Sequence, residues 1–81
     1  MQKIETRTGQ KRGRAALKYM LDAWSMAIEE GHDPDMLANA ALFTALTDLV
    51  AAYGEEEVKR FAGTLPDRIE RGEFTRDRKL Q

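Results

Sequence analysis

Residues 31–54 read GHDPDMLANAALFTALTDLVAAYG and carry the signals that bound a helix at both ends. Asp33 offers a carboxylate to the free backbone N–H groups of a helix start. Pro34 suits the first helical position, where its missing N–H leaves no bond unmade. Gly54 favours a helix end, since glycine adopts the left-handed conformation without a Cβ clash. The stretch therefore predicts a helix over residues 34–53.

This helix is apolar over most of its circumference. Its narrow polar side consists of Asn39, Thr44, Thr47 and Asp48. Such a helix has to be covered on more than one side. Two short neighbouring helices could cover it, or a second copy of the chain could. We expect one side of the helix to pack in the core of the monomer and another to form a subunit contact. The contact site is expected at the remaining apolar surface of this helix or in the groove that it forms with the preceding helix.

The residues before this helix form a second amphipathic pattern. Apolar side chains recur every three or four residues, at Leu17, Met20, Leu21, Trp24 and Ile28. This is the spacing of one helical face. Glycine at position 31 again favours an end. The pattern predicts a helix over about residues 12–30.

The residues after it predict shorter helices. Three glutamates open a helix over about residues 55–63, because carboxylates are favoured at the positive end of the helix dipole. Pro66 then interrupts the backbone hydrogen bonds, and the spacing of Thr64 and Asp67 resembles a capping box that opens a helix over about residues 65–71. Whether residues 55–71 form one kinked helix or two pieces stays open.

The sequence shows no strand-like alternation, so it predicts an all-α fold. We expect a small three- to four-helix bundle that dimerises. The bundle is expected over residues 11–74, between a flexible basic arm at residues 1–10 and a charged tail at residues 75–81. Ile69 and Phe74 are expected to fold back onto its core.

Charge is unevenly distributed along the 81 residues. The net charge is −1, but residues 1–21 carry +5, residues 22–57 carry −9 and residues 58–81 carry +3. Blocks of opposite sign favour binding partners or self-association and say little about the fold. Cysteine is absent, which excludes a disulfide framework and a thiolate zinc site. Good helix packing or oligomerisation is left to support so small a chain.

The sequence offers little for catalysis. It has no cysteine nucleophile, a single histidine at position 32, and no glycine-rich phosphate loop. Residues 29–35, EEGHDPD, gather four carboxylates and an imidazole that a hard cation could use. A helix end followed by an N-cap already explains this composition. We therefore expect no enzyme, no metal site and no cofactor.

Two features favour binding. Aromatic residues and methionine are enriched in interface cores, which predicts a partner or dimer interface at Trp24, Met36, Phe43, Leu46 and Val50. Clustered cations suit phosphate groups, so the possible phosphate contacts are Lys11, Arg12, Arg14 and Lys18. The domain's pI of about 5.8 argues against a basic nucleic-acid-binding domain.

These observations predict a non-catalytic protein-interaction or regulatory protein that acts by surface binding as a homodimer. The alternative is a nucleic-acid-associated protein that uses its basic N-terminal arm. The first residues lack the apolar stretch of a secretory signal. The longest uncharged run, residues 36–47, has 12 residues, whereas a membrane span needs about 20. We expect a cytoplasmic location, a second copy or an unidentified protein as partner, and no membrane partner.

Overall fold

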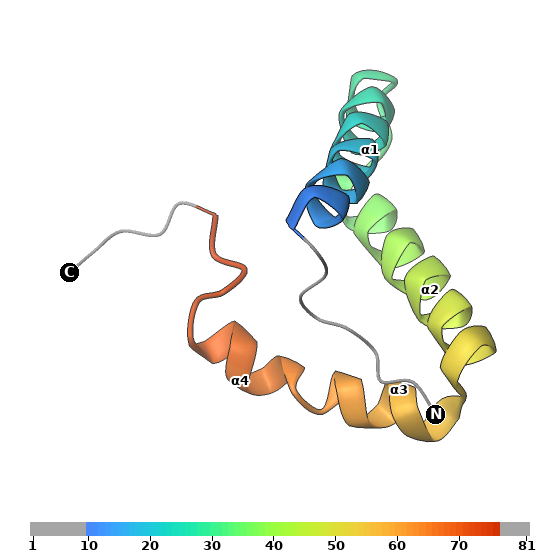
Figure 1. Cartoon of the computed structure of the whole chain (residues 1–81). Helices are drawn as coiled ribbons and strands as arrows, with labels where there is room; N and C mark the ends of the chain where they lie inside the picture. Colours follow the sequence, from blue (N-terminus) through green and yellow to red (C-terminus); the bar gives the residue numbers. More distant parts are fainter. Residues whose placement is uncertain (1–9, 77–81) are drawn as a thin grey trace.

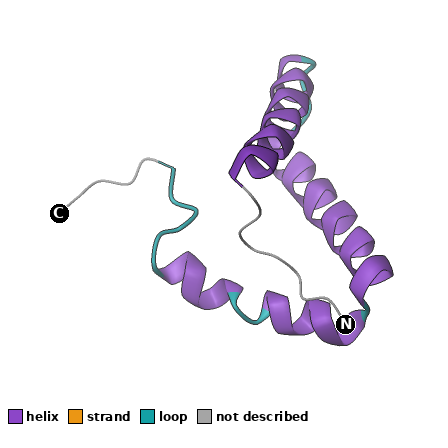
Figure 2. Cartoon of the chain, in the orientation of Figure 1, coloured by secondary structure: helices purple, strands orange, loops and turns teal. Residues whose placement is uncertain are grey.

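The computed structural model describes residues 10–76, with side chains from residue 12 onward, and this part of the chain is helical without strands. It consists of α1 (Gln10–Glu29), α2 (Pro34–Tyr53), α3 (Glu55–Ala62) and the short α4 (Leu65–Glu70). Figures 1 and 2 show their succession. The all-α fold is confirmed. The expected arm and the end of the expected tail, residues 1–9 and 77–81, lie outside the described residues.

The turn between α1 and α2 matches its sequence signals. The Gly31 N–H donates to the carbonyl of Ile28 and the His32 N–H to that of Ala27, at 3.0 and 3.1 Å. Gly31 has φ +93°, so both bonds form without a Cβ clash. Asp33 Oδ1 then accepts the Asp35 N–H at 2.9 Å and caps α2. The two 20-residue helices therefore form a hairpin joined by a tight turn.

Gly54 makes the corner between α2 and α3. Its N–H donates to the Val50 carbonyl at 2.8 Å, and its own carbonyl accepts the Val58 N–H at 3.2 Å. One residue with φ +89° thus ends one helix and begins the next. The chain turns sharply here, and α3 runs across the lower end of α2 (Figure 1).

Residues 55–70 form two helical pieces, which settles the choice that the sequence left open. The break lies at Gly63 and Thr64. The predicted capping box is wrong: the Thr64 hydroxyl donates back to the carbonyl of Phe61 at 2.7 Å and makes no cap bond. Thr64 has right-handed helical φ and ψ, whereas a capping residue needs an extended conformation to reach forward.

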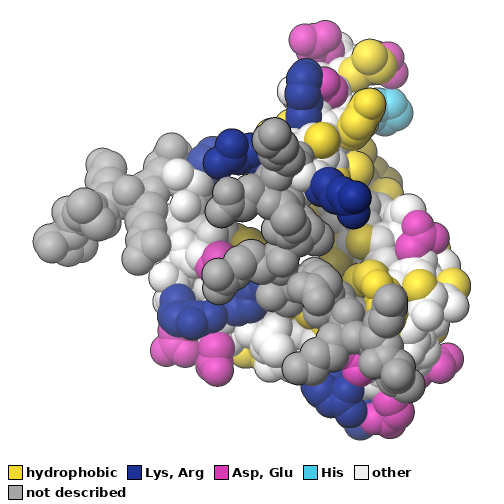
Figure 3. Space-filling model, in the orientation of Figure 1, with side chains coloured by type: hydrophobic (Ala, Val, Ile, Leu, Met, Phe, Trp, Pro, Cys, Tyr) yellow, Lys and Arg dark blue, Asp and Glu magenta, His cyan; other side chains and the backbone are white. Residues whose placement is uncertain are grey.

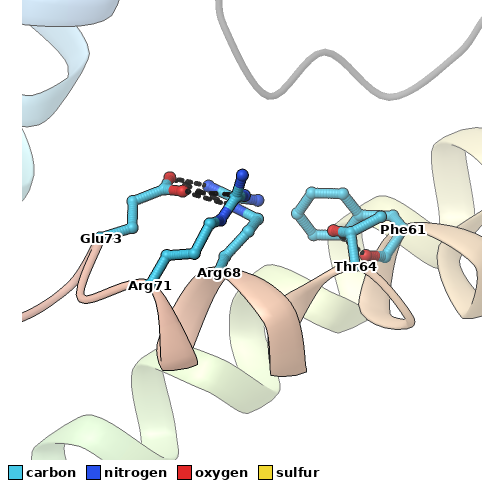
Figure 4. A network of polar contacts seen from close by, with 5 residues as sticks. All are labelled: Phe61, Thr64, Arg68, Arg71 and Glu73. Carbon is cyan, nitrogen blue, oxygen red and sulfur yellow. Dashed lines mark hydrogen bonds and ion pairs between the residues drawn. The ribbon is translucent and has the colours of Figure 1, made fainter.

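A cluster of side chains lies at the C-terminal end of α4. Arg68 donates from Nε to both carboxylate oxygens of Glu73, at 3.0 and 3.1 Å, and Figure 4 shows the two side chains pointing toward each other. The Phe74 ring lies 5.1 Å from the Arg68 guanidinium. Phe74 and Ile69 are exposed, so their predicted packing onto the core is wrong. Phe74 instead stacks locally on a cation.

The helices are arranged as an open curve (Figure 1). α2 contacts α1 on one side and α3 on another. Among the described residues, the buried ones are Val58 and Glu57 alone, at 6% and 8% exposure. Residues 12–76 of one chain therefore enclose no common core, and the predicted dimerising bundle is not confirmed.

Candidate interaction surface

Four of the five residues predicted to form an interface share one face of α2. Phe43, Leu46 and Val50, with Thr47, line a shallow apolar depression of about 330 Å³. Their spacing of three, four and seven residues aligns them along a helix. Met36 lies seven residues before Phe43, which puts it in the same stripe, and it is 71% exposed. Four of the five residues that the sequence predicts for an interface therefore lie along one stripe of α2; their role as an interface stays a prediction.

Trp24, the fifth predicted residue, lies on a different surface. It lines a groove of about 410 Å³ between α1 and α2, whose walls are Met20, Ala23 and Trp24 on α1 and Leu37, Ala40, Ala41, Thr44, Ala45 and Asp48 on α2. The five predicted residues are thus divided between a groove and a depression. The groove between these two helices is one of the two contact sites expected from the sequence. Alanines along α2 leave space there beside α1.

The described basic side chains of α1 form what we call the basic end: Arg12, Arg14 and Lys18. All three are exposed. The Lys18 ammonium pairs with the carboxylate of Asp22 at 2.9 Å. The side chain of Lys11, the fourth predicted phosphate contact, lies outside the described part of the structure. Three of the four predicted contacts are therefore accessible along the first half of α1.

Acidic side chains gather at the opposite end of the hairpin. We call Glu29, Glu30, Asp33 and Asp35 the acidic tip; all four are exposed. Magenta side chains and the single histidine mark it at the top of Figure 3. The imidazole Nε2 of His32 lies 4.0 Å from the Glu30 carboxylate. No three His, Asp or Glu side chains in residues 10–76 converge on a point that could hold a metal ion.

The strongest polar cluster lies apart from both apolar surfaces. The hydrogen bond from Arg68 lowers the pKa of Glu73, and the charges of Arg68 and Arg71 act in the same direction against partial desolvation. The same hydrogen bond raises the pKa of Arg68. Both groups are thereby held in their charged forms. This cluster fixes the chain end after α4 and presents no reactive group to a cavity.

The groove and the depression are both lined mainly by apolar side chains. The groove lining includes one carboxylate, Asp48, and one hydroxyl, Thr44, and the depression lining includes one hydroxyl, Thr47. The other side chains that line the two surfaces are apolar.

α2 also meets the length and composition of a membrane-spanning helix. It is the one such helix among the described residues. The uncharged run counted in the sequence ended at Asp48, but that carboxylate is the single charge between Met36 and Tyr53. The core helix of a soluble protein and a signal sequence meet the same criterion. Length and composition thus give weak support for a membrane location.

Comparison of the chain with protein families, with curated proteins and with solved structures found no match. The chain's function is therefore inferred from the surfaces of the α1–α2 hairpin.

Proposed function

We propose that this chain is a non-catalytic interaction or regulatory protein that acts by surface binding and self-associates through α2. The observation that carries the proposal is the exposure of large apolar side chains along α1 and α2. Phe43, at the middle of α2, leaves 73% of its surface in solvent. An aromatic ring so placed has no role in the packing of the monomer.

The exposed apolar area is large enough for an interface. The exposed large apolar residues of α1 and α2 are Leu17, Tyr19, Met20, Leu21, Met26, Ile28, Met36, Leu42 and Phe43. At about 200 Å² for a whole residue of this size, their exposed fractions leave about 1,100 Å² in water. A standard stable interface takes about 800 Å² from each partner. Contiguous apolar patches of more than a few hundred Å² on soluble proteins mark interaction sites.

A second copy of the chain would also supply the core that the described residues of one chain lack. With one buried apolar side chain among residues 12–76, the described helices bury too little surface to offset the entropy of ordering them. Pairing two α2 helices would place Phe43, Leu46 and Val50 in a shared core. Burial contributes about 25 cal/mol per Å² of apolar surface.

A nucleic-acid-associated role is the alternative proposal. Arg12 and Arg14 lie near the positive end of the α1 dipole, where phosphate groups are favoured. The acidic tip on the same hairpin would repel a polyanion, so we rank this role second. Fluorescence anisotropy of a labelled DNA duplex at low and physiological salt tests it; binding that weakens steeply with salt would promote it.

Light scattering at tens of micromolar tests the proposal. We expect the mass of a dimer for the wild-type chain and a monomer for Phe43→Glu and Leu46→Glu. Ala38→Glu is the control, because Ala38 is exposed, lines neither apolar surface and lies five residues from Phe43, on another side of the helix. A wild-type monomer would refute self-association. Recovery of the protein only in the membrane fraction would instead favour α2 as a membrane helix.

A further inference from the structure

The order of charges along α1 opposes its helix dipole. α1 has no acidic residue in its first turn and no basic residue in its last turn. It begins instead with the basic end and finishes at Glu29. α3 and α4 show the favourable order, with acids first and bases last. Since cations are disfavoured at a helix N-terminus and anions at a C-terminus, the stability of α1 itself does not explain this order.

The two charged groups also lie too far apart to neutralise each other within one chain. Arg12 and Glu29 are separated by about 25 Å along the helix at 1.5 Å per residue. Charges in water are largely screened beyond about 10 Å at 0.1 M salt. The Lys18–Asp22 pair gives little local relief, because it is exposed and has the less favourable orientation for a helix. Within one hairpin, the basic end and the acidic tip therefore do not neutralise each other, and both can attract opposite charges of a partner.

We propose that two copies of the chain pair their α1–α2 hairpins antiparallel, so that the basic end of each lies against the acidic tip of the other. This inference rests on the proposed self-association and adds its orientation. A two-fold axis makes both contacts at once, because each copy supplies both groups. A parallel pair would place like charges together. A nucleic acid would meet the basic end favourably and the acidic tip unfavourably.

Apolar burial and charge have separate roles in this dimer. The exposed side chains of the hairpin supply the affinity, and exposed ion pairs add little to it individually. Opposite charges at both ends select the antiparallel register and disfavour the parallel one. Self-association should consequently weaken as salt rises. A parallel dimer would strengthen, because salt would screen its repulsion.

Charge reversal in α1 tests the orientation. The variants are Arg12→Glu/Arg14→Glu, Glu29→Lys/Glu30→Lys and the combined fourfold reversal, with dissociation constants from sedimentation equilibrium. Each double variant should weaken self-association at least about tenfold, since several exposed pairs become like-charge contacts. The fourfold variant should recover an affinity within about threefold of the wild type, because its reversed ends again match.

These variants allow the effect on folding to be measured separately from the effect on association. Both reversals place charges that the α1 dipole favours, so helicity by circular dichroism should stay equal or rise while the dimer weakens. A wild-type dimer whose fourfold variant stays as weak as the double variants would overturn the antiparallel pairing and leave self-association intact. A wild-type monomer would overturn both. Unchanged dimerisation of Arg12→Glu/Arg14→Glu, with loss of salt-sensitive binding to a labelled DNA duplex, would assign the basic end to phosphate.

Discussion

Removing the cap of α2 should destabilise the hairpin by an amount that the structure specifies. The carboxylate of Asp33 satisfies the Asp35 N–H at 2.9 Å, and losing such a cap typically costs about 1 kcal/mol. Losing its negative charge at the dipole's positive end costs roughly 0.3–1 kcal/mol more, with the lower value fitting an exposed site. Asp33→Ala should thus cost about 1.5 kcal/mol, or roughly 6–12 °C in Tm for a domain of this size.

Asp33→Asn separates the two contributions. An asparagine oxygen can still cap the helix but carries no charge, so this variant should lose only about 2–4 °C. Thermal unfolding followed by circular dichroism measures both variants, at one protein concentration because self-association makes Tm depend on it. Equal Tm values for Asp33→Ala and Asp33→Asn would show that the hydrogen bond contributes nothing and would refute the reasoning.

Three further predictions concern single residues. Val58→Ala truncates the one buried apolar side chain among the described residues. It should lower the free energy of unfolding by about 2 kcal/mol, seen as a Tm roughly 10 °C lower. An unchanged Tm would show that the site collapses or is not a core. Gly31→Ala should cost about 1–2 kcal/mol in a denaturant titration, because φ is +93° although the space around a Cβ is open, and no loss would mean that the turn adopts another conformation. The lowered pKa of Glu73 means that its contact with Arg68 stabilises the chain end above the ordinary glutamate pKa of about 4.3 and is lost as pH falls through the lowered value. The protection factor of the Thr75 amide, whose N–H donates to the Gly72 carbonyl, should fall in acid for the wild type, whereas Glu73→Gln should give a low protection factor at every pH.

Helix boundaries were predictable because their signals are local. The turn at Gly31, the cap at Asp33 and the corner at Gly54 each depend on residues within one helical turn, and all three lie where the sequence predicts them. Gly54 has the expected positive φ, but its ψ of 161° lies outside the left-handed helical region. The capping box at Thr64 failed for an equally local reason. The sequence pattern shows that a hydroxyl is available, but it does not fix the φ and ψ of that residue, and a helical Thr64 can only donate backward.

The division of the apolar surface was not predictable in the same way. A helix that is apolar all round has no preferred face, so its sequence cannot say which side meets α1 and which stays open. The structure resolves this through the splay of the hairpin, which places Trp24 at a groove and Phe43 on the opposite surface of α2. The predicted interface included both Trp24 and Phe43 because both are aromatic. In the structure they line different surfaces.

The two separate apolar surfaces constrain how copies of this chain could assemble. A two-fold dimer uses the same patch on both copies, so pairing through the Phe43 depression would leave the groove at Trp24 open. The groove of one copy could instead bind the α2 surface around Phe43 of the next copy. That contact would be heterologous and would extend into a ring or a filament. A defined dimer mass with Phe43→Glu monomeric, and with Ala41→Glu in the groove still dimeric, would therefore show that the groove is left for another partner. Loss of assembly in both variants, with larger species in the wild type, would show instead that the two surfaces bind each other.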